Sequence, residues 1–235
     1  MSDFRTYDLG RGSVTSAEVR NRVLRNTYWL LALSMIPTVF GAWIGISTGF
    51  AMFAAASPMM TLLLFFAVAM GLIFAIERFR NSGVGVVLLL AFTFFMGLML
   101  SRLLSFVLGM INGPTLIMMA FGGTAVIFGV MATVATVSKR NFAGLGQWLF
   151  MGVIVLIVAS IANMFLHLPA LMLTVSVIAV VIFSAYILFD LQRVVNGGET
   201  SYVSATLRIY LDLYNVFTNL LVILSIFGGG GGNRN

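Results

Sequence analysis

Seven long apolar segments dominate this sequence and leave room for little except helices that cross a membrane. A helix needs about 20 apolar residues to cross the hydrocarbon core of a bilayer, and each segment has about that length. The segments are too long for strands and do not alternate. The sequence therefore predicts an all-α, polytopic membrane protein with seven transmembrane helices. The segments cover residues 28–47, 57–76, 84–106, 114–136, 144–166, 169–189 and 206–227.

The scarcity of charge supports this prediction and excludes several classes of protein. Charged residues make up 9% of the 235 residues, whereas a soluble domain carries about 25%. So few charges cannot cover a globular surface, and disorder needs the opposite composition. The chain has no cysteine, which removes disulfides and cysteine metal sites. No zinc-hydrolase, phosphate-loop or serine-elbow pattern is present, so we expect no enzymatic activity and no cofactor.

Basic residues collect on one predicted side of the bundle. That side carries 11 of the 13 Lys and Arg residues, and the other side carries only Arg102 and Arg234. Because basic residues favour the cytoplasmic side, we expect a cytoplasmic N-terminus and, after seven crossings, an external C-terminus. The basic residues are dispersed, so nucleic acid is not an expected partner. The 11 residues are Arg5, Arg11, Arg20, Arg22, Arg25, Arg78, Arg80, Lys139, Arg140, Arg193 and Arg208.

The polar residues before the first apolar segment predict a cytoplasmic arm. Thr15 and Glu18 have the spacing of a capping box, and Val19 and Val23 then share one helical face. We expect a short amphipathic helix on the membrane surface; the alternative is that this segment is the start of the first span. The first apolar run is long for a cleaved signal peptide. The expected division is an arm at residues 1–27, a seven-helix domain at 28–227 and a flexible Gly-rich tail at 228–235.

Two aspartates lie where the apolar segments should hold no charge. Asp190 closes the sixth segment, and Asp212 lies about two turns inside the seventh. A carboxylate in such a setting costs a few kcal/mol unless it is paired or neutral. The sixth segment ends on the predicted side where the seventh begins. Both carboxylates should therefore lie in the cytoplasmic half of the bundle, at similar depth.

Each aspartate belongs to a polar stripe along its own segment. The stripe around Asp212 recurs at spacings of four, three and four, so its members share one helical face, which should point into the bundle. A simpler interpretation is that each aspartate neutralises the arginine three or four residues away. The longer stripe consists of Arg208, Asp212, Asn215 and Asn219, and the shorter one of Tyr186, Asp190 and Arg193.

Two neighbouring carboxyl groups in a low-dielectric setting support two kinds of chemistry. They cannot both ionise at low cost, so Asp190 and Asp212 can share a proton and act as a pH switch. They also supply the oxygen ligands that a hard cation such as Ca²⁺ prefers. The sequence leaves both uses open.

Several segments are similar to the signature of the Bax inhibitor-1 family, the transmembrane BAX-inhibitor-motif proteins, which include bacterial YccA-like members. The similarity runs from about residue 20 to residue 227. The paired aspartates at this spacing are the more specific part, and the glycine-rich segments alone would be weaker. The segments are Gly97–Ser101, Asn112–Pro114, Ala120–Phe128, Tyr186–Asp190 with Gln192, and Ala205–Leu207 leading to Tyr210–Phe217.

The resemblance implies a fold and a set of residue roles. The fold would be a seven-helix bundle with the last helix at its centre, and the activity a pH-sensitive Ca²⁺ leak. Asp190 and Asp212 would form the pH-sensing pair. An arginine at the cytoplasmic end of the second span would latch onto that pair; Arg78 or Arg80 can fill this role, and Glu77 can compete for either.

Two hypotheses of function follow from the residues and the resemblance. The first is a Ca²⁺ leak channel of the bacterial inner membrane, gated by protonation of the aspartate pair, with Ca²⁺ as the permeant ion. The alternative is a non-conducting regulator that binds a membrane protease or another membrane complex through its N-terminal arm. A proton-coupled transporter is a third interpretation, but no internal repeat supports it.

Overall fold

The chain folds into a bundle of long helices. The computed structural model describes the backbone of residues 4–229 and the side chains of residues 18–228 except Ala54 and Ala55. Within this range there are eight helices and no strand. The helices are α1 (Phe4–Ser47), α2 (Phe50–Ala56), α3 (Pro58–Arg78), α4 (Gly83–Leu108), α5 (Gly113–Val137), α6 (Leu145–Leu166), α7 (Pro169–Val195) and α8 (Tyr202–Gly229).

The expected seven spans are confirmed. Among the described residues, seven helices are long and apolar enough to cross a membrane, and the first of these spans begins at Glu18. The short helix α2 was not predicted; it follows Gly49, whose φ of 77° turns the chain after α1. Prolines mark the first turns of α3, α5 and α7, where a missing backbone N–H costs nothing.

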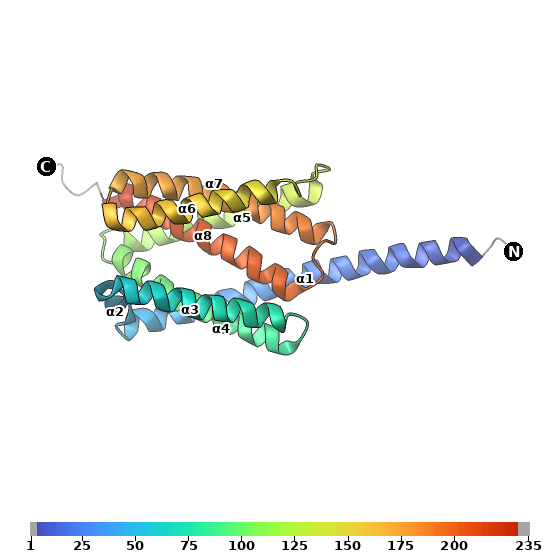
Figure 1. The fold of residues 1–235 in the computed structure, drawn as a ribbon, viewed down its shortest axis with the longest axis horizontal. Helices are drawn as coiled ribbons and strands as arrows, with labels where there is room; N and C mark the ends of the chain where they lie inside the picture. Colours follow the sequence, from blue (N-terminus) through green and yellow to red (C-terminus); the bar gives the residue numbers. More distant parts are fainter. Residues whose placement is uncertain (1–3, 230–235) are drawn as a thin grey trace.

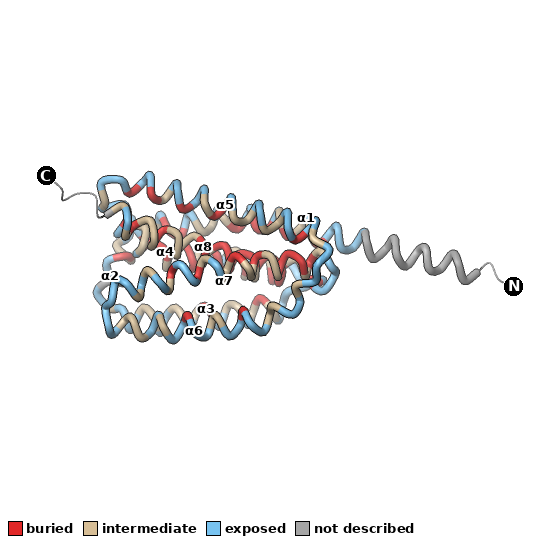
Figure 2. Tube along the Cα trace, turned by 90° about the horizontal axis from the view of Figure 1, so that it is seen from above, coloured by how far each residue is buried: buried red, intermediate tan, exposed pale blue. Residues whose placement is uncertain are grey.

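The last helix occupies the centre of the bundle, as expected. Figure 1 shows α5, α6 and α7 on one side, α1 to α4 on the other, and α8 crossing between them. Helix α8 packs against α1, α3, α4, α5 and α7. Figure 2 shows buried residues on the inner faces and exposed ones around the outside. The outward positions are apolar, as in Phe74 and Val181, which suits a surface that faces lipid.

The N-terminal region differs from the expected separate amphipathic helix. Helix α1 runs without a break through residue 28, and its first part projects beyond the bundle (Figure 1). No glycine or proline lies between residues 13 and 36 to end a helix there. Val23 is buried against Val194 and Ala205, which fixes the base of the projection to the α7–α8 junction. Residues 1–3 and most of the expected C-terminal tail, residues 230–235, lie outside the described residues.

Helices α1 and α4 approach each other closely along small residues. A Cβ atom built on Gly41 would meet the carbonyl oxygen of Phe94, and one built on Gly97 would meet the carbonyl oxygen of Thr38. Glycine permits such backbone-to-backbone contact, which is a common way to join helices in membranes. This pairing forms one rigid wall of the bundle.

Candidate functional site

The structure brings Asp190 and Asp212 together at the α7–α8 interface. Asp190 lies near the C-terminal end of α7, and Asp212 lies in the first half of α8. Their exposed fractions are 7% and 5%, and their carboxyl groups lie close enough to influence each other. Antiparallel neighbours joined by a short connection place these positions at similar depth, which is the geometry that the sequence predicted.

The charged groups around the pair come from α7, α8 and their connection. Arg208, one turn before Asp212, acts electrostatically on both carboxyl groups. Arg193 and Glu199 act on Asp190. Arg193 forms its ion pair with Glu199, at 4.0 Å between Nη2 and Oε2, and not with the aspartate three residues before it.

Two buried atoms in this site lack a hydrogen-bond partner in the described part of the chain: Oδ2 of Asp212 and Nε of Arg208. A buried acceptor without a donor costs about 1–3 kcal/mol. A proton shared with Asp190 would satisfy the Asp212 oxygen, and so would a bound cation. The site can therefore hold a proton or a cation between its carboxyl groups.

The remaining members of the two stripes have local partners. The Nδ2 atom of Asn215 donates to the carbonyl of Leu211 at 2.8 Å, and that of Asn219 donates to the carbonyl of Asn215 at 2.8 Å. Both side chains are half-buried. Tyr186 lies close enough to both aspartates for their charges to act on it, and its ring packs against Phe189.

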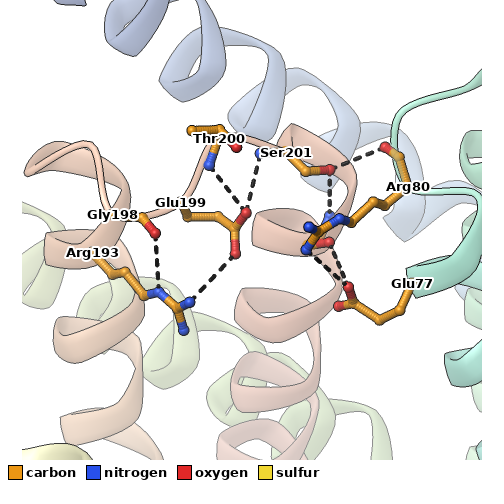
Figure 3. Close-up of polar contacts among 8 residues, drawn as sticks. Glu77, Arg80, Arg193, Gly198, Glu199, Thr200 and Ser201 are labelled. Carbon is orange, nitrogen blue, oxygen red and sulfur yellow. Dashed lines mark hydrogen bonds and ion pairs between the residues drawn. The ribbon is translucent and has the colours of Figure 1, made fainter.

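The two arginines expected to latch the pair lie elsewhere in this structure. Arg80 pairs with Glu77, at 3.6 Å between Nη1 and Oε2, and Arg78 is exposed. Figure 3 shows this contact beside the start of α8, where the Ser204 hydroxyl donates to Glu77 at 3.0 Å. Neither arginine is among the groups that act on the aspartates in the described residues. The latch therefore stays a prediction. Glu77 pairs with Arg80 in this structure, which is the competition for the arginine that the sequence indicated.

A dedicated metal centre is not found among the side chains that the structure describes. No group of three or more His, Cys, Asp and Glu residues has the geometry to hold a metal ion there. A cation at the pair would therefore have two carboxylates as its charged ligands.

Sequence reasoning missed the polar contacts that join α8 to distant helices. The Tyr210 hydroxyl lies 2.8 Å from the Thr38 Oγ1 and donates to the Thr93 carbonyl at 3.4 Å. The Tyr214 hydroxyl donates to the Met96 carbonyl at 3.2 Å. These partners are more than 100 residues apart in sequence, so no spacing within one helix could reveal them. They connect the helix that carries Asp212 to the α1–α4 wall.

Comparison with known proteins agrees with the expected family. The family model described as "Inhibitor of apoptosis-promoting Bax1" matches residues 20–229. The "Modulator of FtsH protease YccA" of Escherichia coli is 35% identical over 210 residues, which cover 89% of this chain and 92% of the relative. The same alignment holds for a second strain, where the relative is named "Inner membrane protein YccA". An uncharacterized membrane protein of Vibrio cholerae is 36% identical, over 88% of this chain and 90% of the relative.

The family match covers the seven spans except the first two residues of the first one, and it includes the α7–α8 interface that holds the aspartate pair. The chain therefore belongs to the family of Bax1 inhibitors, the Bax inhibitor-1 family.

Proposed function

We propose that this chain is an inner-membrane protein that modulates a membrane-bound protease. The observation that carries the proposal is the similarity, at 35% identity over 89% of the chain, to a protein named as a modulator of the FtsH protease. A bundle of seven apolar helices lies in the same bilayer as such a protease, so the two can meet through lateral diffusion. No chemistry on the partner is needed, because binding alone can change the activity of a protease.

The projecting part of α1 is the segment we assign to the contact with the protease. It extends beyond the bundle (Figure 1), and Glu18, Arg20 and Arg22 on it are exposed. Because the helix is continuous with the first span and Val23 anchors its base, the projection holds a fixed direction. A preformed helix loses less conformational entropy on binding than a disordered arm would.

The proposed orientation places this projection in the cytoplasm. Figure 1 shows the α3–α4, α5–α6 and α7–α8 connections at the same end of the bundle as the projection. That end carries basic residues such as Arg78, Lys139 and Arg193, whereas Arg102 lies toward the other end. Basic residues remain on the cytoplasmic side when helices insert, so the C-terminus would lie in the periplasm.

Removal of the projection tests the proposal. A chain that lacks residues 1–17 keeps the whole first span and Val23, so it should insert and accumulate normally. The half-life of a membrane-protease substrate in cells should change when the full chain is overproduced, and should not change with the truncated chain. A chain that lacks residues 230–235 is the matched control and should act like the full one. Equal modulation by both truncated chains would contradict the proposal.

A second function, a pH-responsive Ca²⁺ leak, is favoured by a separate observation. This observation is the buried Asp190–Asp212 pair, in which Oδ2 of Asp212 has no donor among the described residues. Taking up a shared proton would change the charge of the α7–α8 interface and so the force that holds α8 in place. Arg208 already faces the pair in this structure, and Arg78 or Arg80 would reach it only after a movement of α3.

Flux measurements test this second function independently of the first. Ca²⁺ entry into proteoliposomes should vary between about pH 5.5 and 8, and the variation should disappear in Asp190→Asn and Asp212→Asn, which cannot share a proton as two acids do. Arg102→Gln changes an exposed charge far from the pair and should leave the pH profile unaltered. An unaltered profile in both aspartate variants would exclude the pair as the pH sensor.

A further inference from the structure

The α5–α6 connection, residues 138–144, is held in a fixed shape by one side chain of α7. Gln192 is 4% exposed; its Oε1 atom accepts the N–H of Phe142 at 2.7 Å, and its Nε2 atom donates to the carbonyl of Arg140 at 2.6 Å. The buried amide both donates to and accepts from the backbone of one loop, so it holds that backbone in place. The connection is therefore a fixed platform on the end of the bundle.

Several other polar groups of this connection pair within it or with the helices on either side. The Ser138 hydroxyl oxygen accepts the N–H of Arg140 at 3.2 Å, and the Asn141 Oδ1 atom accepts the N–H of Ala143 at 2.9 Å. The N–H of Leu145, where α6 begins, donates to the carbonyl of Phe142 at 2.9 Å. These contacts hold the loop backbone at several points, and the charged groups that it presents are side chains.

Those side chains are two exposed cations, Lys139 and Arg140. Neither forms an ion pair with any carboxylate that the structure describes, whereas Arg80 and Arg193 at the same end are paired with Glu77 and Glu199. Residues 138–144 contain no acidic residue of their own. The platform therefore presents a local positive charge that no described carboxylate neutralises.

The flanks of the platform are apolar and face outward. Val137, at the end of α5, is 75% exposed, and Trp148, in the first turn of α6, is 71% exposed. Both helices are spans, so their shared end lies at the boundary between hydrocarbon and water, where an outward-facing tryptophan settles. An occupant of this place must offer a negative group beside an apolar body.

We propose that the α5–α6 connection is a binding site for an anionic phospholipid. Lys139 and Arg140 bind the phosphate of the headgroup, the acyl chains lie against Trp148 and Val137, and Gln192 holds the platform in place. Phosphate accepts hydrogen bonds from both kinds of basic side chain, and the apolar flanks distinguish a lipid from an acidic protein segment. This site is independent of the protease contact and of the aspartate pair.

Quenching by brominated lipids tests the proposal on the full chain. Trp29→Phe and Trp43→Phe leave Trp148 as the single tryptophan. In bilayers that contain equal fractions of phosphatidylglycerol and phosphatidylcholine, bromine is placed on the chains of one lipid or the other. The brominated phosphatidylglycerol should quench Trp148 more strongly, with an apparent preference of about fivefold for each basic side chain that contacts the headgroup.

Two pairs of substitutions show whether the preference belongs to this site. Lys139→Gln with Arg140→Gln should abolish it, and Arg20→Gln with Arg22→Gln, which removes two exposed cations from α1, should leave it intact. Gln192→Met should weaken it by releasing the loop, in protein whose unfolding temperature shows that the bundle is intact. Equal quenching by the two lipids in the parent chain would overturn the proposal. A preference for phosphatidylglycerol that survives the loss of Lys139 and Arg140 would overturn it too. An acidic protein segment would then be the better occupant of the site.

Discussion

The α1–α4 interface and the α7–α8 interface join helices in opposite ways. Along α1 and α4, Gly41 and Gly97 bring backbones into contact. Along α7 and α8, two carboxyl groups are buried side by side, and one of their oxygens lacks a donor in the described residues. The first interface is built for close packing. The second gives up some stability to bury ionisable groups, which is typical of a functional site.

The α1–α4 interface is a fixed part of the molecule, whereas the α7–α8 interface is suited to change. Backbone contacts allow no graded movement, since a small shift of α1 against α4 produces a clash. An interface that buries two carboxyl groups beside Arg208 changes its energy whenever a charge is gained or lost. Helix α8 lies between the two regions and is tied to the fixed wall by Tyr210 and Tyr214.

The largest expected effect comes from disturbing the fixed wall. Gly41→Ala should lower the free energy of unfolding by about 3 kcal/mol, because the added Cβ meets a carbonyl oxygen that belongs to the backbone of α4. The matched substitution is Gly71→Ala on α3, where a Cβ would meet nothing within 4 Å. It should not lower the free energy of unfolding. Thermal unfolding in detergent, followed by circular dichroism, measures both. Equal stability of the two variants would remove the distinction between the interfaces.

An effect of opposite sign is expected at the α7–α8 interface. Asp212→Asn removes one of two adjacent acids and supplies an N–H to the pair, so it should raise the free energy of unfolding by about 1–3 kcal/mol. The reciprocal variant Asp190→Asn should act in the same direction, since either substitution removes the conflict between the two acids. A loss of stability as large as that of Gly41→Ala would show that the pair is a structural contact like those of the fixed wall.

The smallest effect is expected where the two regions are joined. Tyr210→Phe loses the contacts to Thr38 and Thr93 and should lower the free energy of unfolding by about 1 kcal/mol. Tyr202→Phe is the control, because the Tyr202 side chain makes no hydrogen bond in the described part of the chain, and it should change stability by less than about 0.5 kcal/mol. The same unfolding measurement compares them. If both substitutions lower the free energy of unfolding by the same amount, the hydroxyl of Tyr210 does not stabilise the packing of α8 against the α1–α4 wall.

The seven spans and the meeting of Asp190 with Asp212 could be predicted because both follow from local signals. Length and hydropathy define a span, and alternating direction places the end of the sixth span beside the start of the seventh. Helix α2 was not foreseen, and the unbroken α1 was foreseen only as the alternative to a separate amphipathic helix. The reason is that apolar runs indicate which residues lie in the membrane and not where a helix begins. The Gln192 contact with residues 140 and 142 depends on a fold that brings distant segments together.

The central claim, that the projecting part of α1 contacts a membrane-bound protease, has a direct test in living cells. A photo-crosslinking amino acid is placed at Arg22 on the projection or at Arg102 toward the other end of the bundle, both of which are exposed. We predict a crosslinked product with a membrane protease from position 22 and none from position 102. Absence of the product from position 22, in cells where the chain still changes the turnover of a protease substrate, would contradict the account.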